Sequence, residues 1–479
     1  MNTHTPLQEI AEFTALQNRE ISNIESLLQL RGNDLVELME HAAEKRDSRL
    51  AHLGRPGVIT YSKKVFIPVT TLCRDRCHYC TFVNTPKQAE QKGMPLFMSE
   101  EQVLSIAIQG ARIGCKEALF TLGDRPEDRW PEAQNWLEQH GFNSTIDYLE
   151  HLARRVLVET GLLPHVNPGV MTLEEFEQLR KVSPSMGMML ETTSMDLWET
   201  PGKAHFGSPD KDPRVRLEVI RASGTAQVPF TTGLLIGIGE TTRDRAESLF
   251  LLKSDAEKFG NIQEIIIQNF RAKPSTAMQG AADAEWEEYL AAVSTARMVF
   301  GLDVAIQAPP NLADPDHVSE LLSAGVDDWG GVSPLTPDHV NPERPWPAIE
   351  VLYSRTKDSG YTLKERLTAH PEFVRNPDVW FDSEVAPYVA RLSSQESGLA
   401  EVHVQQLLFD ENTDNLWSVH VSETRNLLRK IESDRKLVSD NDFASLLELS
   451  GNDLDELCKI ADESRRNHVG DVVTYVTNR

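Results

Sequence analysis

The sequence predicts an α/β fold, a (β/α)8 barrel of the TIM type with helical extensions before and after it. Short apolar runs of strand character alternate with helical patterns along most of the 479 residues, and this rhythm is typical of a parallel sheet. Eight such units favour a closed barrel. The predicted strands end in glycine and polar residues, as expected where the loops after the strands build a site at one mouth of a barrel.

Eight apolar runs are predicted strands, and each of the first seven precedes a segment long enough for a helix. The runs begin at Lys64, Glu117, Leu162, Met186, Val228, Glu264, Asp303 and Asp327. The helix after the fifth run is expected to end at Gly260, because glycine commonly terminates helices.

We expect four regions along the chain. A helical extension, 1–57, precedes the barrel region, 58–340. A Pro-rich stretch from Val332 leaves the barrel and leads into a second helical extension, 341–442. The last region, 443–479, is a truncated repeat of the first.

The repeat links the two ends of the chain. The segment "SLLQLRGNDLVELMEHAAEKR" at 26–46 matches "SLLELSGNDLDELCKIADESR" at 445–465. Both copies have a helical pattern broken at Gly-Asn-Asp, where Asp34 or Asp453 is placed to cap a second helix. Chance similarity between two helical hairpins is the alternative. The shared Gly-Asn-Asp-Leu-x-Glu-Leu run favours a duplicated module whose second copy stops before its own cysteines.

Composition disfavours several classes of protein. The formal net charge is −25, which opposes binding to nucleic acid or to an anionic membrane. No stretch has the uncharged apolar length of a membrane span. The N-terminus has neither the basic nor the apolar region of a secretion signal. We therefore expect a cytoplasmic protein with no nucleic-acid and no membrane partner.

Three of the five cysteines lie within one short loop. Cys73, Cys77 and Cys80 form a Cys-x3-Cys-x2-Cys spacing after the first predicted strand, at the mouth of the barrel. Three thiolates from one loop suit an iron–sulfur cluster with one iron left open. A structural zinc site normally has a second pair of ligands. Zinc with His78 as fourth ligand, and unliganded thiols, are the alternatives. The other two cysteines are expected to be buried fillers: Cys115 and Cys458.

The cysteine spacing, with the aromatic Tyr79 before the last cysteine, resembles the signature of radical S-adenosylmethionine (SAM) enzymes. The resemblance implies a [4Fe-4S] cluster on Cys73, Cys77 and Cys80, with S-adenosyl-L-methionine bound to the open iron through its amino and carboxylate groups. It also implies that one electron splits this cofactor into methionine and a 5′-deoxyadenosyl radical, which removes hydrogen from an unactivated carbon. The protein would hold the reactants and exclude water.

Three further strand ends resemble elements that grip S-adenosylmethionine in this family. The stretch 121–127, "TLGDRPE", resembles a Gly-Gly-Glu-like element that receives the methionyl ammonium, and a turn with a helix N-cap is the alternative. Glu191 is placed to accept hydrogen bonds from the ribose. The stretch 233–240, "GLLIGIGE", resembles a Gly-x-Ile-x-Gly-x-x-Glu element near the adenine. The implied cofactor-binding residues are Tyr79, Gly123, Asp124, Glu127, Glu191, Gly233, Gly237 and Glu240.

Longer stretches narrow the resemblance. "YSKKVFIPVTTLCRDRCHYCTF" from Tyr61, "LPHVNPG" from Leu163 and "IIIQNFRAKPST" from Ile265 are similar to the CofG-type module of FO synthase. FO is 7,8-didemethyl-8-hydroxy-5-deazariboflavin. The resemblance covers residues 25–390, and 443–479 looks like the start of a CofH-type module.

The resemblance implies a carbon–nitrogen lyase of the ammonia-lyase class. Its substrate is the 5-amino-5-(4-hydroxybenzyl)-6-(D-ribitylimino)-5,6-dihydrouracil adduct, supplied by a CofH-type module or subunit. Its products are FO, ammonia, 5′-deoxyadenosine and methionine, and a reducing electron donor is also needed. The alternatives are another radical SAM enzyme (a CofH-type tyrosine-dependent synthase, a tyrosine lyase or an aminofutalosine-type synthase) and a zinc-clipped scaffold barrel without activity.

Such a small-molecule substrate is polar and mostly neutral, so fixed hydrogen-bond donors and acceptors are expected around it rather than a cluster of cations. Polar residues at the ends of the third, sixth and seventh strands are the candidates. Each of them could instead satisfy backbone groups at a strand end. The predicted substrate-binding residues are His165, Asn167, Gln268, Asn269, Arg271 and Gln307.

Overall fold

The computed structural model describes residues 6–314 and 317–401, and a few isolated positions between 446 and 470. The chain divides into two units: Met1–Ala111 with Cys115–Val402, and Arg112–Gly114 with His403–Arg479. The barrel belongs to the first unit. The predicted repeat at 443–479, and the part of the predicted C-terminal extension beyond residue 401, lie outside the described residues apart from those isolated positions.

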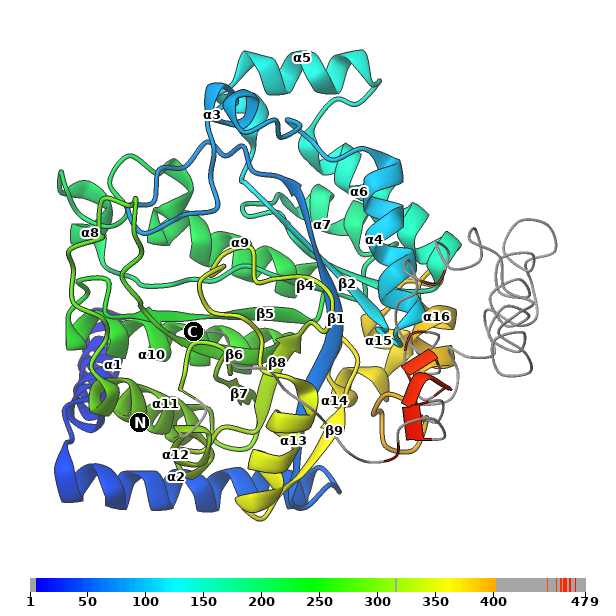
Figure 1. The fold of residues 1–479 in the computed structure, drawn as a ribbon. Coiled ribbons are helices and arrows are strands. Elements are labelled where there is room, and N and C mark those ends of the chain that lie inside the picture. Colours follow the sequence, from blue (N-terminus) through cyan, green and yellow to red (C-terminus); the bar gives the residue numbers. More distant parts are fainter. Residues whose placement is uncertain are drawn as a thin grey trace, which may run out of the picture. The chain divides into compact units, whose positions relative to one another are not determined.

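Eight parallel strands close into a barrel, as predicted (Figure 1). Each strand pairs with the next along the chain, and β8 and β2 both pair with β1, which closes the ring. Every strand overlaps the run predicted for it. The strands are β1 Val58–Thr70, β2 Glu117–Leu122, β3 Leu163–Asn167, β4 Ser185–Gly187, β5 Phe230–Ile236, β6 Ile262–Asn269, β7 Ala305–Gln307 and β8 Asp328–Val332.

A ninth strand corrects the prediction of a purely helical C-terminal extension. β9, Thr362–Glu365, pairs in parallel with the first residues of β1, Val58–Tyr61. β1 can hold this extra partner because it is 13 residues long and pairs with β2 only from Lys64 onward. The four residues of β9, two of them charged, are too short a run to give a strand pattern in the sequence.

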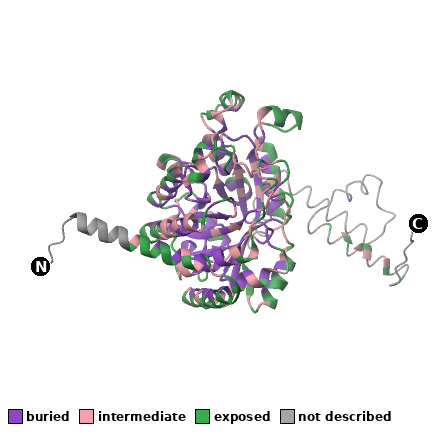
Figure 2. Ribbon diagram, turned by 90° about the vertical axis from the view of Figure 1, so that its left-hand side faces the viewer, coloured by how far each residue is buried: buried purple, intermediate pink, exposed green. Residues whose placement is uncertain are grey.

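Helices surround the barrel, and their outward faces are exposed while the strands are buried (Figure 2). Two form the N-terminal extension: α1 Pro6–Leu28 and α2 Gly32–His52. Those between barrel strands are α3 Pro86–Gln91, α4 Glu100–Arg112, α5 Pro131–Gln139, α6 Thr145–Thr160, α7 Leu173–Leu179, α8 Met195–Glu199, α9 Pro213–Thr225, α10 Thr242–Phe259, α11 Trp286–Phe300 and α12 Val318–Ser323. Those after β8 are α13 Ile349–Asp358, α14 Pro371–Val374, α15 Pro377–Trp380 and α16 Ala386–Leu392.

Local signals set the ends of these helices. Thr241 and Asp244 form a capping box at the start of α10, and Gly260 ends that helix with a φ of 67°, as predicted and as glycine readily allows. Asp34 is not a cap. Because α2 begins at Gly32, Asp34 lies in its first turn, where a negative charge interacts favourably with the helix dipole.

The amino-terminal ends of the strands, here called the floor of the barrel, are tied to α2 by buried arginines. Arg46 donates to Leu322 O at 2.6 Å. Arg49 of α2 and Arg297 of α11 both pair with Asp327 next to β8. Each of these arginines therefore has at least one partner, and Arg49, Arg297 and Asp327 form a buried ionic network at the floor.

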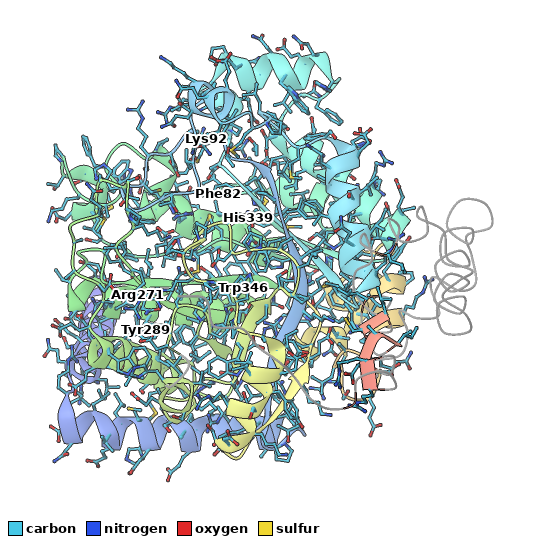
Figure 3. All side chains as sticks on the ribbon, in the orientation of Figure 1. Phe82, Lys92, Arg271, Tyr289, His339 and Trp346 are labelled. Atoms are coloured by element: carbon cyan, nitrogen blue, oxygen red, sulfur yellow. The ribbon has the colours of Figure 1, made fainter. Side chains whose placement is uncertain are left out.

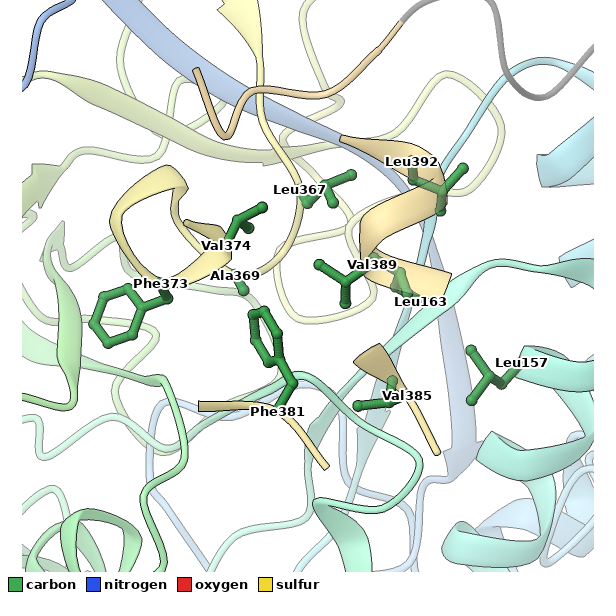
Figure 4. Packing of buried hydrophobic residues seen from close by; sticks show 10 residues of the cluster. All are labelled: Leu157, Leu163, Leu367, Ala369, Phe373, Val374, Phe381, Val385, Val389 and Leu392. Atoms are coloured by element: carbon green, nitrogen blue, oxygen red, sulfur yellow. The ribbon is translucent and has the colours of Figure 1, made fainter. Parts of the chain in front are cut away.

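The segment after β9 packs on the barrel through an apolar cluster (Figure 4). Leu157 at the end of α6 and Leu163 at the start of β3 meet side chains from 367–392, so this segment lies at the floor. The members are Leu157, Leu163, Leu367, Ala369, Phe373, Val374, Phe381, Val385, Val389 and Leu392.

Two further expectations can be checked outside the barrel strands. Within the described part of the chain, none of the helices has the length and apolar character that crossing a bilayer requires. Cys115 is buried, as expected of a filler. Cys458 is exposed, so the expectation of a buried filler is wrong there.

Candidate active site

A cavity of about 410 Å³ lies inside the barrel and opens at the carboxyl-terminal ends of the strands, here called the mouth. Side chains alternate in direction along a strand, so every second residue points into a barrel. β1 thus contributes Lys64 and Phe66 to the cavity wall, and β3 contributes His165 and Asn167. The loops after the strands complete the wall.

The three predicted cluster cysteines lie in this wall, on the loop after β1. Cys73 is buried, and Cys77 and Cys80 are half-buried. Cys73 Sγ accepts hydrogen bonds from the backbone N–H groups of Asp75 and Asp124, at 3.4 and 3.2 Å. Such donors favour a thiolate over a thiol and are typical of the surroundings of cluster ligands.

Two side chains hold the backbone of the cysteine loop in place. Trp130 Nε1 donates to Cys73 O at 3.0 Å. Arg129 donates to the carbonyl oxygens of Arg74 and Asp75, at 2.9 and 3.2 Å. These contacts fix the loop from the side of η1, Pro126–Asp128, and the segment that follows it.

The donor set fits an iron–sulfur cluster. Burial raises the pKa of the Cys73 thiol above its ordinary range and that of Cys77 to about 12, so a metal must displace the protons. All three cysteines come from one loop and line the cavity. Three thiolates from one loop are the ligand set of an iron–sulfur cluster that leaves one iron open toward the cavity.

Two residues of the stretch 121–127 reach the cysteine loop. A Cβ on Gly123 would lie 1.8 Å from Leu72 O, so only glycine lets β2 approach the loop this closely. Asp124 is buried in the cavity wall, and its Oδ1 has no partner. Burial, followed by repulsion from Asp210 and Asp75, holds the pKa of Asp124 well above its usual range.

Glu191 lies in the cavity wall with both carboxylate oxygens engaged. Lys211 Nζ donates to Oε1 at 2.6 Å, Tyr79 OH donates to Oε2, and His205 Nε2 lies 3.0 Å from Oε2. Burial favours the neutral acid, but Lys211 and His205 outweigh it and hold the pKa of Glu191 well below its ordinary value. Glu191 therefore stays ionised and fixes Tyr79 beside the cysteines.

Four of the predicted cofactor residues lie outside the cavity wall: Glu127, Gly233, Gly237 and Glu240. The Glu127 carboxylate accepts hydrogen bonds from the N–H and the hydroxyl of Thr145, at 2.9 and 2.6 Å. It therefore satisfies the first turn of α6, whose N–H groups need acceptors, and does not line the cavity.

The other three residues belong to β5 and to the turn that follows it. A Cβ on Gly233, within β5, would lie 2.0 Å from Ile266 O, so this glycine serves the close packing of β5 on β6. Glu240 accepts the backbone N–H groups of Gly237 and of the next residue, both at 2.8 Å, and pairs with Arg245 at 2.6 Å. Glu240 therefore holds the turn, and of the stretch 233–240 it is Leu235 that lines the cavity.

All six predicted substrate residues line the cavity. They are His165, Asn167, Gln268, Asn269, Arg271 and Gln307. His165 Nδ1 lies 2.6 Å from Ser185 Oγ. Burial, followed by the nearby positive charge of Lys64, holds the pKa of His165 well below its ordinary value, so the imidazole is neutral at pH 7 and can both donate and accept.

The Pro-rich stretch after Val332 does not leave the barrel, which corrects the prediction. Thr336 Oγ1 accepts the N–H of Phe66 at 2.8 Å, and Val340 O accepts from Lys273 Nζ at 2.7 Å. The stretch therefore stays over the mouth. Its anchors lie far away in the sequence, so no local pattern could reveal them.

Four more wall residues were missed by sequence reasoning: Lys211, Arg216, Lys273 and Trp346. Arg216 is 5% exposed, and its Nε and one terminal nitrogen have no partner in the part of the chain that the structure describes. It comes from the first turn of α9, whose sequence "PRVRLEV" is typical of a surface helix. Lys273 and Trp346 lie in stretches that the sequence analysis quoted, but nothing local distinguishes them from surface residues.

The fold and the cysteine loop together define a class of protein. A parallel barrel of eight strands, with three cysteines on the loop after the first strand and a deep cavity beneath them, is the architecture of a radical SAM enzyme. The Radical SAM superfamily pattern matches residues 67–252, which run from β1 through most of α10.

Curated relatives give the family within this class. The chain is 49% identical over 499 residues to an FO synthase of Streptomyces coelicolor, covering 95% of this chain and 57% of that protein. It is 46% identical over 339 residues to a 7,8-didemethyl-8-hydroxy-5-deazariboflavin synthase of Methanopyrus kandleri, covering 71% of this chain and 99% of that protein. The chain therefore belongs to the FO synthase family of radical SAM proteins. It spans less than two thirds of the length of the Streptomyces relative.

Solved structures agree on the fold. The FeFe-hydrogenase maturase HydG from Carboxydothermus hydrogenoformans matches with a TM-score of 0.57 at 16% identity, covering 92% of this chain and 93% of that one. Methylornithine synthase PylB matches with a TM-score of 0.55 at 17% identity, covering 72% and 93%. At these identities the likeness shows the fold alone.

Proposed function

We propose that this chain carries out the deazaflavin-forming radical step of FO synthesis. It converts the 5-amino-5-(4-hydroxybenzyl)-6-(D-ribitylimino)-5,6-dihydrouracil adduct into FO and ammonia, and S-adenosyl-L-methionine becomes methionine and 5′-deoxyadenosine. Because a carbon–nitrogen bond breaks without water, the enzyme is an ammonia-lyase. A CofH-type module or subunit supplies the adduct, and a reducing electron donor serves the cluster. Residues 443–479 begin such a CofH-type module.

The observation that carries this proposal is that the cavity wall has buried polar atoms without partners on two sides. Near the cysteine loop, Asp124 and Arg216 carry such atoms, as judged within the described part of the chain. On the side of β3 and β6, the atoms without partners include the amide oxygens of Asn167 and Asn269, and Gln307 of β7 is close by. A zwitterionic amino-acid group suits the first side, and the amide edges and hydroxyls of a ribityl-uracil suit the second.

The residues of this chain then have separate tasks. When bound, the cluster and S-adenosylmethionine supply an electron and a 5′-deoxyadenosyl radical that takes a hydrogen atom from the benzylic carbon of the substrate. Cys73, Cys77 and Cys80 would hold the cluster, and Asp124 and Arg216 would hold the amino-acid part of the cofactor.

The opposite wall acts on the substrate. Neutral His165 and the amides of β3, β6 and β7 orient the uracil without adding charge. The ring closes, ammonia leaves, and the substrate radical gives up one electron, which would replace the electron that the cluster supplies to S-adenosylmethionine. The floor excludes water from below, because its ionic network is buried.

The test is direct. The chain is reconstituted with iron and sulfide without oxygen, reduced with dithionite, and given the adduct with S-adenosylmethionine. FO fluorescence with formation of 5′-deoxyadenosine supports the proposal. Formation of p-cresol from tyrosine without FO would assign a tyrosine lyase instead, and a colourless protein with stoichiometric zinc would favour the scaffold.

A further inference from the structure

The segment between β8 and α13, residues 333–346 and here called the strap, is built into the mouth of the cavity. Besides the hydrogen bond from Lys273, Thr336 accepts the N–H of Phe66, and Asp338 Oδ2 accepts from Asn311 Nδ2 at 2.9 Å. The strap is therefore fastened to the loops after β6 and β7 and to β1. A segment anchored at three separate points holds its side chains in fixed positions.

The strap brings Trp346 onto Phe66 of β1. The two ring centroids lie 5.0 Å apart with the planes inclined by 21°, and both half-buried rings line the cavity. Trp346, labelled in Figure 3, has a buried Nε1 without an acceptor among the described residues. A buried indole N–H normally has an acceptor. The pair thus gives the cavity a flat apolar wall and one N–H donor that is available to a ligand oxygen.

Polar groups without partners lie in the same part of the wall. Asn311 donates to Asp338 of the strap and to Arg344 O, while its Oδ1 has no partner. Arg271 Nε is likewise buried without an acceptor. Both residues line the cavity. An aromatic wall with amide and N–H groups at its side suits a flat heterocycle that carries carbonyl and N–H edges.

A second stacked pair shows what the same motif does as pure structure. Phe97 and Trp136 have ring centroids 4.6 Å apart at 25°. They pack further against Tyr148 and His140, and neither lines the cavity. This pair joins the outer helices, so it offers a matched control with nearly the same ring geometry.

Resting on the function proposed above, we infer that Phe66 and Trp346 seat the pyrimidinedione ring of the substrate, with the Trp346 N–H donating to a ring carbonyl. Trp346 is then a positioning residue: it fixes the uracil so that the benzylic carbon lies toward the cysteine loop. Removal of the Trp346 ring weakens substrate binding. It also lets S-adenosylmethionine be cleaved more often without formation of FO.

The test uses the reconstituted full chain and the variants Trp346→Leu, Trp346→Phe and Trp136→Phe. Stacking against an aromatic side chain contributes enough that Trp346→Leu raises KM for the adduct roughly 10- to 100-fold. Trp346→Phe keeps a ring and loses one hydrogen bond, so KM rises roughly threefold to tenfold. In both variants the amount of 5′-deoxyadenosine formed per molecule of FO rises above the wild-type value. Trp136→Phe leaves KM and this ratio at the wild-type values.

A probe identifies the seated ring. 5-Amino-6-(D-ribitylamino)uracil carries the pyrimidinedione without the hydroxybenzyl group, and its inhibition constant should rise in Trp346→Leu as KM does. An unchanged inhibition constant beside a raised KM overturns the assignment of the pyrimidinedione. FO formation with KM and product ratio unchanged in Trp346→Leu overturns the seat and leaves the proposed function standing. Absence of FO from the wild-type chain overturns both.

Discussion

A buried arginine at the floor of the barrel and one at the mouth differ in whether their nitrogens have hydrogen-bond partners. At the floor, Arg366 is 1% exposed, and its nitrogens donate to Asp328, Glu264 and backbone oxygens. At the mouth, Arg216 is almost as buried, yet its Nε and one terminal nitrogen have no partner among the described residues. A buried polar group without a partner costs about 1–3 kcal/mol. The surroundings of Arg366 are therefore complete as structure, whereas those of Arg216 form a site that a ligand completes.

If this comparison holds, the substitution with the largest effect on activity lies at the mouth and leaves the fold intact. Cys77→Ala removes one of three cluster ligands on a loop outside the core, so cluster-bound iron and 5′-deoxyadenosine formation should be lost. The free energy of unfolding should stay within about 1 kcal/mol of the wild type. Iron content, product analysis and urea unfolding measure these effects.

Cys115 provides the control for that experiment, because it is buried and does not line the cavity. Cys115→Ala should keep the cluster and lose about 1 kcal/mol of stability through the space it leaves. Continued formation of 5′-deoxyadenosine by Cys77→Ala would refute the assignment of the mouth.

The largest effect on stability should come from the floor. Arg366→Met leaves Asp328 and Glu264 buried without their cation, and breaking a buried pair in this way costs about 3–5 kcal/mol. Urea unfolding of the metal-free chain measures it. Exposed Arg214, which pairs with Asp212, is the control: Arg214→Met should change stability by less than about 0.5 kcal/mol. Equal effects of the two substitutions would remove the contrast between the ends.

The matching substitution at the mouth should change the stability little and the affinity for a ligand strongly. Arg216→Met removes a buried cation whose Nε and one terminal nitrogen lack partners among the described residues, so the free energy of unfolding should change by less than about 1 kcal/mol. Binding of S-adenosylmethionine to the reconstituted chain should weaken roughly 10- to 100-fold, because its carboxylate loses a charged partner. Equilibrium dialysis measures the affinity. A large loss of stability with unchanged affinity would place Arg216 with the structural arginines.

The same contrast explains what the sequence could predict. The strands and the cysteine loop are coded locally, by apolar runs and by three cysteines in eight residues, and both were predicted correctly. Glu127 and Glu240 carry the right chemistry at the right strand ends, but backbone N–H groups of neighbouring turns take up their carboxylates. Which acceptor meets which donor depends on tertiary contacts, and a sequence pattern does not contain them.

The residues that the sequence analysis missed were missed for the same reason, because tertiary contacts place them. Arg216 lies on a helix that looks like a surface helix, and Trp346 follows a run of prolines that is typical of an exit from the fold. Both enter the cavity wall because distant elements hold them there, through the packing of α9 against β5 and the contact of the strap with β1. A pattern of spacing finds groups that work within one loop, whereas a wall assembled from several loops needs the structure.

Lowering the pH should have the smallest effect of those predicted here, a reversible loss of stability through Glu372 at the floor. Burial favours its neutral form, but Arg49 and Arg55 outweigh this and lower its pKa to about 2. A carboxyl whose pKa is lower in the folded than in the unfolded chain stabilises the fold fully above the unfolded value, near 4.5, and loses that contribution as pH falls toward 2. Glu372 is 22% exposed, so we expect about 1–2 kcal/mol in total.

The measurement compares urea unfolding of the wild type and Glu372→Gln between pH 7 and pH 3. Above about pH 5 the variant should be less stable by the full amount, and the gap between the two should narrow steadily as the solution becomes more acidic. A gap that stays constant with pH would mean that Arg49 and Arg55 are satisfied as well by the neutral carboxylic acid of Glu372 as by its carboxylate. In that case hydrogen bonding, rather than charge, would hold this corner of the floor together.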